Sequence, residues 1–150
     1  MKSITYHEQQ DTKNTDINVP IFGYELIRDI LIPDILGKDT PDILYWAGKS
    51  LARNFPLVTT EEINAFFTEA GWGSLELAVM TKKEMKFELS GPIIARRIDM
   101  KNEDSFKLEA GFLAEQIQNQ KKVITETIEE VHKKQKKVTF LLRWDQKDTV

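Results

Sequence analysis

The sequence predicts an α+β fold in which N-terminal helices precede an antiparallel β-meander, a central helix and a closing β-hairpin. Three observations support this prediction. Up to Gly71, apolar residues recur at the spacing of three and four that is typical of amphipathic helices. Over 75–79 and 86–89 they alternate with polar residues, as in strands. A second helical pattern over 105–117 separates these strands from a last pair of alternating runs.

The first expected helix covers 21–36 and carries an unusually broad apolar face. Pro33 is expected to end or kink this helix near Ile32, and Gly37 suits the stop after its last turn. The polar residues of the segment fill one narrow strip, formed by Glu25, Arg28 and Asp29. A face this wide exceeds what one contact with the core requires, which indicates a second contact.

Two more helices follow, each bounded by residues that favour helix ends. One is expected to begin at Thr40 and to end before Pro56. Its expected core face consists of Ile43, Leu44, Ala47, Leu51 and Phe55. The other begins with the capping box Thr59-x-x-Glu62 and ends at Gly71.

The strands follow from alternation and from the turns between them. A polar turn at 81–84 joins the first two strands into a hairpin, and Ile93–Met100 is expected to be a third strand. The closing hairpin comprises Val123–Val131 and Val138–Trp144, joined through the lysine-rich turn at 133–137. The first of these two runs also fits a helical spacing, and its β-branched residues favour the strand.

The central helix, 105–117, is apolar on two opposite sides, because Leu108 and Phe112 point away from its main apolar face. That main face consists of Phe106, Ala110, Leu113, Ala114 and Ile117. Such a helix is expected to lie between two layers, with Asp104 or Ser105 as its cap. Gly111 in its middle costs about 1 kcal/mol relative to alanine. Gly111 and Ala114 are therefore expected to allow close approach of a neighbouring layer.

Length and composition indicate a single domain over 19–146, between a polar, flexible arm at 1–18 and a short tail at 147–150. The formal charge of −3 is atypical of nucleic-acid-binding domains. The absence of cysteine excludes disulfides, thiolate catalysis and S-acylation. No run reaches the roughly 18 apolar residues that span a bilayer, and the first residues lack the apolar region of a signal peptide. A soluble cytoplasmic protein is expected.

No arrangement of residues predicts catalysis, a metal or another cofactor. His7 lies in the arm and His132 beside the lysine-rich turn, with no carboxylates at ligand spacing. The tract Lys133–Lys137 is most simply a solvated turn, and nucleic-acid binding is not expected. Arg96 and Arg97 are adjacent in the expected third strand, so one of them must face the interior. A structural ion pair there is preferred over ligand binding.

The segments Phe66–Leu75 and Leu108–Ala114, in this order of elements, resemble the YslB-like family of small uncharacterised bacterial proteins. The resemblance covers roughly residues 20–145. It extends to a ligand-binding fold shared by vinyl-reductase-type domains, core subunits of the TRAPP tethering complex and haem-based nitric-oxide sensors. This resemblance implies an antiparallel sheet flanked by helices, and often homodimers formed through the first helices.

The departures from these relatives prevent any transfer of functional residues. Vinyl-reductase-type domains typically carry cysteines near the central helix and the last hairpin, and acylated TRAPP subunits modify a cysteine, whereas this chain has none. Haem sensors need a proximal histidine and a Tyr-x-Ser-x-Arg motif, which are also missing. Likeness of fold does not by itself carry function.

The leading functional hypothesis is a non-enzymatic, homodimeric binding or adaptor domain. The candidate interface residues are Phe22, Leu26 and Ile30 in the first helix and Tyr45 and Trp46 in the second. The alternative is a sensor or carrier of a small apolar ligand held between the central helix and the sheet. The candidate ligand-binding residues are Trp72, Arg96, Gly111 and Phe112.

Overall fold

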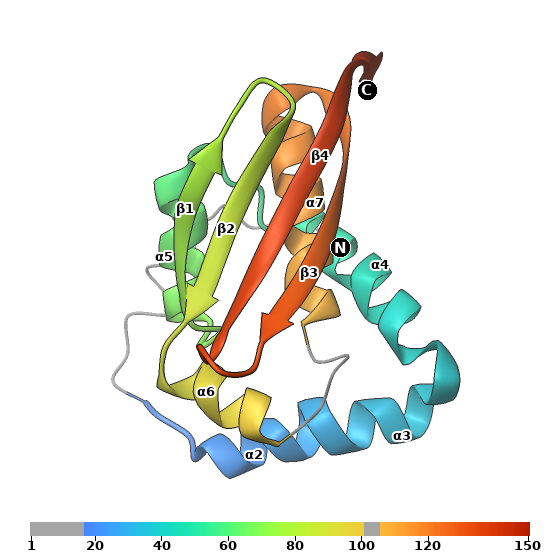
Figure 1. Ribbon diagram of the computed structural model, residues 1–150. Helices are drawn as coiled ribbons and strands as arrows, with labels where there is room; N and C mark the ends of the chain where they lie inside the picture. Colours follow the sequence, from blue (N-terminus) through green and yellow to red (C-terminus); the bar gives the residue numbers. More distant parts are fainter. Residues whose placement is uncertain (1–16, 101–105) are drawn as a thin grey trace.

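A four-stranded antiparallel sheet in the order β1-β2-β4-β3 forms one layer of the molecule, and helices cover one of its faces (Figure 1). The computed structural model describes residues 17–100 and 106–150. The strands are β1 (Ser74–Met80), β2 (Glu84–Ser90), β3 (Val123–His132) and β4 (Lys137–Thr149). The predicted α+β class is therefore confirmed, as are both hairpins.

The helices form a layer behind the sheet and a continuous segment across one end of it (Figure 1). The helical elements in chain order are α2 (Ile21–Glu25), the π-helix η1 (Leu26–Leu31), α3 (Ile32–Leu36), the 3₁₀-helix η2 (Gly37–Asp39), α4 (Thr40–Asn54), α5 (Thr60–Glu69), α6 (Pro92–Asp99) and α7 (Lys107–Lys121). Helix α7 lies against the sheet, and α4 packs along α7.

Pro33 was expected to end or kink the first helix near Ile32, and the helix does not end there. It passes from α2 through η1 into α3 and reaches Leu36, where Gly37 with φ of 69° stops it. Pro33 lies in the first turn of α3, directly after the π-helical segment. In the π-helical turn before it, the backbone N–H of Ile32 donates to the carbonyl of Ile27, and a π-helical turn of this kind marks an interruption of the α-helical hydrogen-bond ladder, as proline also does.

The expected third strand, Ile93–Met100, is wrong, because this segment forms helix α6. Gly91 with φ of 115° turns the chain, and Pro92 starts the helix at a position that suits its fixed φ. The residues that α6 buries follow helical spacing: Ile94, Arg97 and Ile98. The meander is therefore reduced to the β1–β2 hairpin, and Arg96 and Arg97 are neighbours on a helix.

The predicted starts and ends of α5, β3 and β4 agree with the structure in part. Thr59 caps α5, where its hydroxyl oxygen accepts a hydrogen bond from the backbone N–H of Glu62 at 3.1 Å. Strand β3 is observed where a helix was the alternative, and β4 continues past Trp144 to Thr149. The expected arm up to residue 16 and the proposed caps Asp104 and Ser105 lie outside the described residues.

Helix α7 is buried without interruption from Glu109 to Ile117, which confirms that it lies between two layers. Gly111 faces α4, where a Cβ atom would overlap the carbonyl oxygen of Tyr45 and lie 2.8 Å from its carbonyl carbon. Gly48 of α4 is equally close to α7, since a Cβ there would lie 2.8 Å from the amide nitrogen of Phe112. The two glycines allow the two helices to touch backbone to backbone.

Candidate functional site

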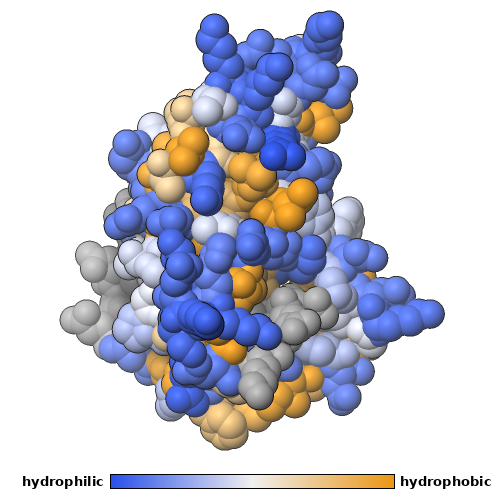
Figure 2. Space-filling view, viewed as in Figure 1, coloured by the Kyte–Doolittle hydropathy of each residue, from blue (hydrophilic) through white to orange (hydrophobic). Residues whose placement is uncertain are grey.

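The segment α2–η1–α3 turns three of its four charged side chains toward the interior and six of its apolar side chains outward, while Asp34 in α3 is exposed. Glu25 and Arg28 are 1% and 7% exposed, and the side chain of Asp29 is 6% exposed. The outward side chains are between 42% and 70% exposed, and we call them the apolar helix face: Phe22, Leu26, Ile27, Ile30, Leu31 and Ile35. Figure 2 shows hydrophobic surface along the lower edge of the molecule, where Figure 1 places this segment.

Glu25, the first of the inward charges, pairs with Arg96 of helix α6. The guanidinium of Arg96 donates two hydrogen bonds to the carboxylate of Glu25, from Nε at 2.5 Å and from Nη2 at 3.0 Å. This bidentate pair lowers the pKa of Glu25, mainly through the hydrogen bonds from Arg96. The pair therefore fixes α2 against α6 at one point.

A second contact fixes the first helical segment in the interior, at Glu109 of α7. Its carboxylate accepts hydrogen bonds from Arg28 of η1 and, at 3.3 Å, from Arg97 of α6. Arg97 also lies 3.6 Å from Asp29, and Arg28 donates to the hydroxyl of Tyr24 at 2.8 Å. Burial acts against the charge of Arg28, yet the interactions with Glu109 and Tyr24 raise its pKa overall. Three helical elements thus share one ionic network.

These contacts determine which side of the segment faces solvent. Turning the apolar helix face inward would separate Glu25 from Arg96 and Arg28 from Glu109, and uncompensated buried charges are strongly unfavourable. The apolar helix face therefore stays on the surface of the single chain. A contiguous exposed apolar patch of this kind is typical of an interaction site.

The five predicted interface residues fall into two groups. Phe22, Leu26 and Ile30 belong to the apolar helix face, and Trp46 of α4 is 65% exposed. Tyr45 is half-buried and ties α4 to β3: its hydroxyl donates to Glu126 at 2.7 Å and accepts from the backbone N–H of Thr127 at 3.1 Å. Burial raises the pKa of Tyr45, and the hydrogen bond to Glu126 adds to the increase.

The four predicted ligand-binding residues are not gathered at one site. Trp72 and Phe112 do meet, with ring centroids 5.2 Å apart, and Phe66 stacks on Phe112 at 4.7 Å. Gly111 instead faces the backbone of α4, and Arg96 pairs with Glu25. Because aromatic side chains fill the space around Phe112, which is completely buried, these contacts do not favour a ligand there.

Sequence reasoning did not single out Glu109 or Arg28, the centre of the ionic network. The signal for Arg28 was the narrow strip of charged residues on an otherwise apolar first helix, to which the sequence alone assigned no direction. The interior ion pair expected for one of the two neighbouring arginines is confirmed at Arg97, which is 1% exposed. In the basic turn, Lys136 pairs with Asp99 and Lys137 with Glu88, so two of its lysines serve local ion pairs.

The described residues, 17–100 and 106–150, contain neither a metal-binding cluster of side chains nor a helix that could span a membrane. No group of three or more histidine, aspartate or glutamate side chains there is arranged to hold a metal ion. No helix in the same two ranges has both the length and the apolar character needed to cross a membrane.

Comparison with known proteins agrees with the resemblance drawn from the sequence. The family model described as "Protein of unknown function (DUF2507)" matches residues 21–143. The uncharacterised protein YslB of Bacillus subtilis (strain 168) is 50% identical over 135 residues, which cover 90% of this chain and 91% of YslB.

A solved structure supports the fold. The crystal structure of a vinyl-4-reductase family protein from Methanocaldococcus jannaschii superimposes with a TM-score of 0.65, covering 91% of this chain and 88% of that chain. The sequence identity between the two chains is 20%. At this level of identity the likeness shows a shared fold.

Proposed function

We propose that this chain, which belongs to the DUF2507 family, is a non-enzymatic binding or adaptor domain that works as a homodimer. In this proposal the apolar helix face of one copy packs on the same face of a second copy. A single observation carries the proposal: the first helical segment turns Glu25, Arg28 and Asp29 inward and exposes six apolar side chains.

A second copy suits this face because the face is complementary to itself. The six residues that form it carry no charge, and a two-fold axis places one apolar patch against an identical one. Homodimer interfaces are more apolar at their core than the rest of a protein surface. The carboxylates behind the face pair with arginines, so their arrangement supports a positioning role for them and not acid–base chemistry.

Size-exclusion chromatography with light scattering tests the proposal. At micromolar concentration the chain of 17.4 kDa is expected to elute with about twice that mass. Ile27→Glu places a charge on the apolar helix face and is expected to give a folded monomer, with the circular dichroism of the parent protein. A parent protein that is already monomeric at this concentration would contradict the proposal.

Ile128→Glu is the matched control. Ile128 of β3 is 63% exposed and Ile27 of η1 is 58% exposed, so both substitutions add the same charge at equally accessible positions. The control variant is expected to keep the dimer mass. Loss of the dimer in both variants would assign the effect to charge in general and would count against this interface.

A further inference from the structure

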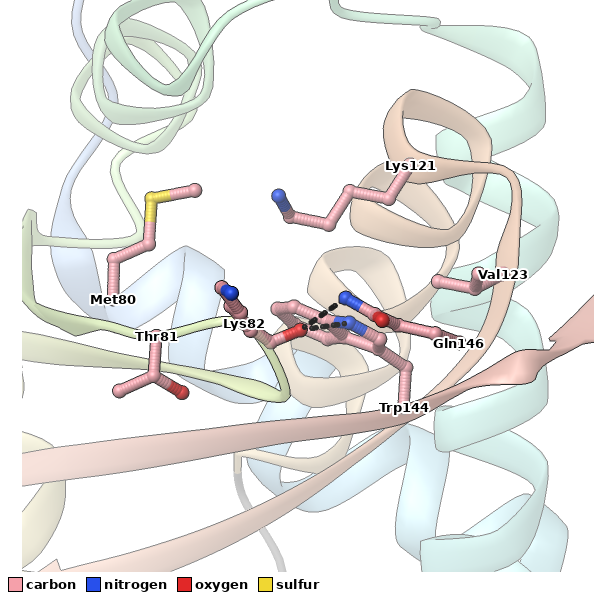
Figure 3. A pocket seen from close by; sticks show the side chains of 7 residues that line it. All are labelled: Met80, Thr81, Lys82, Lys121, Val123, Trp144 and Gln146. Carbon is pink, nitrogen blue, oxygen red and sulfur yellow. Dashed lines mark hydrogen bonds between the residues drawn. The ribbon is translucent and has the colours of Figure 1, made fainter.

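Helix α7 ends at the same end of the sheet as the turn between β1 and β2 (Figure 1), and a hollow lies there (Figure 3). Its volume is about 590 Å³, which lies in the range typical of small-molecule sites. The residues that matter for its chemistry are Met80, Lys82, Lys121, Val123, Trp144 and Gln146. The first helical segment lies at the opposite end of the sheet, so the hollow is separate from the apolar helix face.

Trp144 gives the hollow a fixed apolar wall. Its indole Nε1–H donates to the carbonyl oxygen of Lys82 at 2.9 Å, and the amide of Gln146 donates to the same oxygen at 3.2 Å (Figure 3). Trp144 is 8% exposed, so its ring is held by the core as well as by this hydrogen bond. The side chains of Met80 and Val123 extend the apolar lining. A ring fixed in this way can receive a flat or aliphatic group without reorganisation.

Two cations line the same hollow. The ammonium group of Lys121 lies 5.1 Å from the centre of the Trp144 ring, and Lys82 extends from the neighbouring turn. Within the described part of the chain, neither lysine has a carboxylate within 4.0 Å, in contrast to Lys107, Lys136 and Lys137, which form ion pairs. The positive charge of this hollow is therefore not neutralised by an ion pair.

Further charged residues of both signs lie near the hollow. Lys83 and Lys147 lie beside the hollow with Asp145, whose carboxylate accepts a hydrogen bond from the backbone N–H of Lys147 at 3.0 Å. Lys122 follows Lys121 at the end of α7. The five lysines around the hollow outnumber the two aspartates at the end of β4, Asp145 and Asp148, so an anion is favoured over a cation there.

We infer that this hollow binds a small organic anion, in which an apolar group rests on Trp144 and a carboxylate meets Lys82 and Lys121. The apolar wall and the two lysines face one space, which matches a molecule with one apolar and one anionic end. The inference does not depend on the homodimer, and it differs in place and in chemistry from an apolar ligand beside Phe112.

Titration with 2-naphthoate and with octanoate tests the inference on the full chain. The readout is the chemical shift of the Trp144 indole Nε1–H in a ¹H–¹⁵N spectrum, in which Trp46 and Trp72 serve as internal references. Saturable movement of the Trp144 signal alone is the expected result. Binding of naphthoate only would assign a flat ligand, and binding of octanoate as well would assign a general apolar carboxylate.

A neutral ligand and variants that lack lysine charge test whether Lys82 and Lys121 bind the carboxylate. The neutral 2-naphthamide is expected to bind at least tenfold more weakly than 2-naphthoate, because hydrogen bonds to a charged group are worth about this factor. K82Q/K121Q is expected to weaken naphthoate by a similar factor, whereas K38Q/K134Q, which removes two exposed lysines that do not line the hollow, leaves it unchanged. No saturable shift at millimolar naphthoate, or equal binding by K82Q/K121Q, would overturn the inference.

Discussion

Gly48 and Gly111 set the distance between α4 and α7 because neither helix can carry a side chain at the crossing point. Each glycine faces backbone atoms of the other helix, and backbone cannot move aside as the end of a flexible side chain can. The conformational cost of a glycine inside a helix is accepted here in return for close packing. The sequence alone indicated that Gly111 needs a close neighbour, but it could not identify that neighbour as Gly48.

Gly111→Ala is expected to lower the free energy of unfolding by about 2–3 kcal/mol, because the added methyl group forces α4 and α7 apart. Urea unfolding followed by circular dichroism measures the change. Gly23→Ala is the matched control, since a Cβ at Gly23 of α2 meets no atom within 4 Å. The control is expected to leave stability unchanged or to raise it by up to about 1 kcal/mol. Equal effects of the two variants would contradict the close crossing.

The pair of Glu25 and Arg96 is expected to make stability depend on pH in acid. The pKa of Glu25 is lowered in the folded chain, so its contribution is present above the pKa of the unfolded state, about 4.3, and is lost as pH falls through the folded value. Arg96→Gln is therefore expected to reduce stability at pH 7 more than at pH 3, as measured by urea unfolding at both values. The exposed pair of Arg143 and Glu84 supplies the control, because Arg143→Gln is expected to change stability little at either pH.

At the scale of elements, local sequence signals predicted most helices and strands, but the pattern over 93–100 predicted a strand where the structure has helix α6. Caps, prolines and alternation identified α4, α5, both hairpins and α7. The run 93–100 is short, rich in isoleucine and follows Gly91-Pro92, and these features suit a short strand as well as the first turns of a helix. The burial of Ile94 and Ile98 on one side of α6 distinguishes the two, and that contact is not local information.

The first helix shows a different limit of sequence reasoning. Periodicity identified its broad apolar face, but it does not say whether that face meets the core of the same chain or another molecule. The direction is decided by Arg96, Arg97 and Glu109, which are more than 65 residues away in sequence from Glu25 and Arg28. A single sequence contains no signal that pairs these charges.

Tyr45→Phe is expected to destabilise the fold by about 1–2 kcal/mol, because it removes the acceptor for the backbone N–H of Thr127 on strand β3. Thermal or urea unfolding measures the loss. Glu126→Gln removes the charge of the exposed partner but leaves that acceptor, so an effect below about 0.5 kcal/mol is expected. If Tyr45 acts instead through an interface between copies, Tyr45→Phe will change the mass in light scattering and not the stability.

At the scale of the whole molecule, the two ends of the sheet have different character. One end carries a helix whose apolar side points outward, held in place by buried ion pairs. The other end carries lysines around a fixed indole ring. Between the two ends, α7 is buried against the sheet on one side and α4 on the other. Association through the first end would therefore leave the second end accessible.

If folding and association through the apolar helix face are coupled, the melting temperature is expected to rise with protein concentration. A tenfold increase corresponds to about 1.4 kcal/mol for each dimer, and so to roughly 2 °C for two chains of this length. Differential scanning calorimetry at 10 and 100 µM measures the shift. Ile30→Glu places a charge on the same face and is expected to give a melting temperature that is lower and independent of concentration. A parent protein whose melting temperature does not change with concentration would show that the chain reaches its stable fold alone, and the exposed side chains of η1 would then need an occupant other than a second copy.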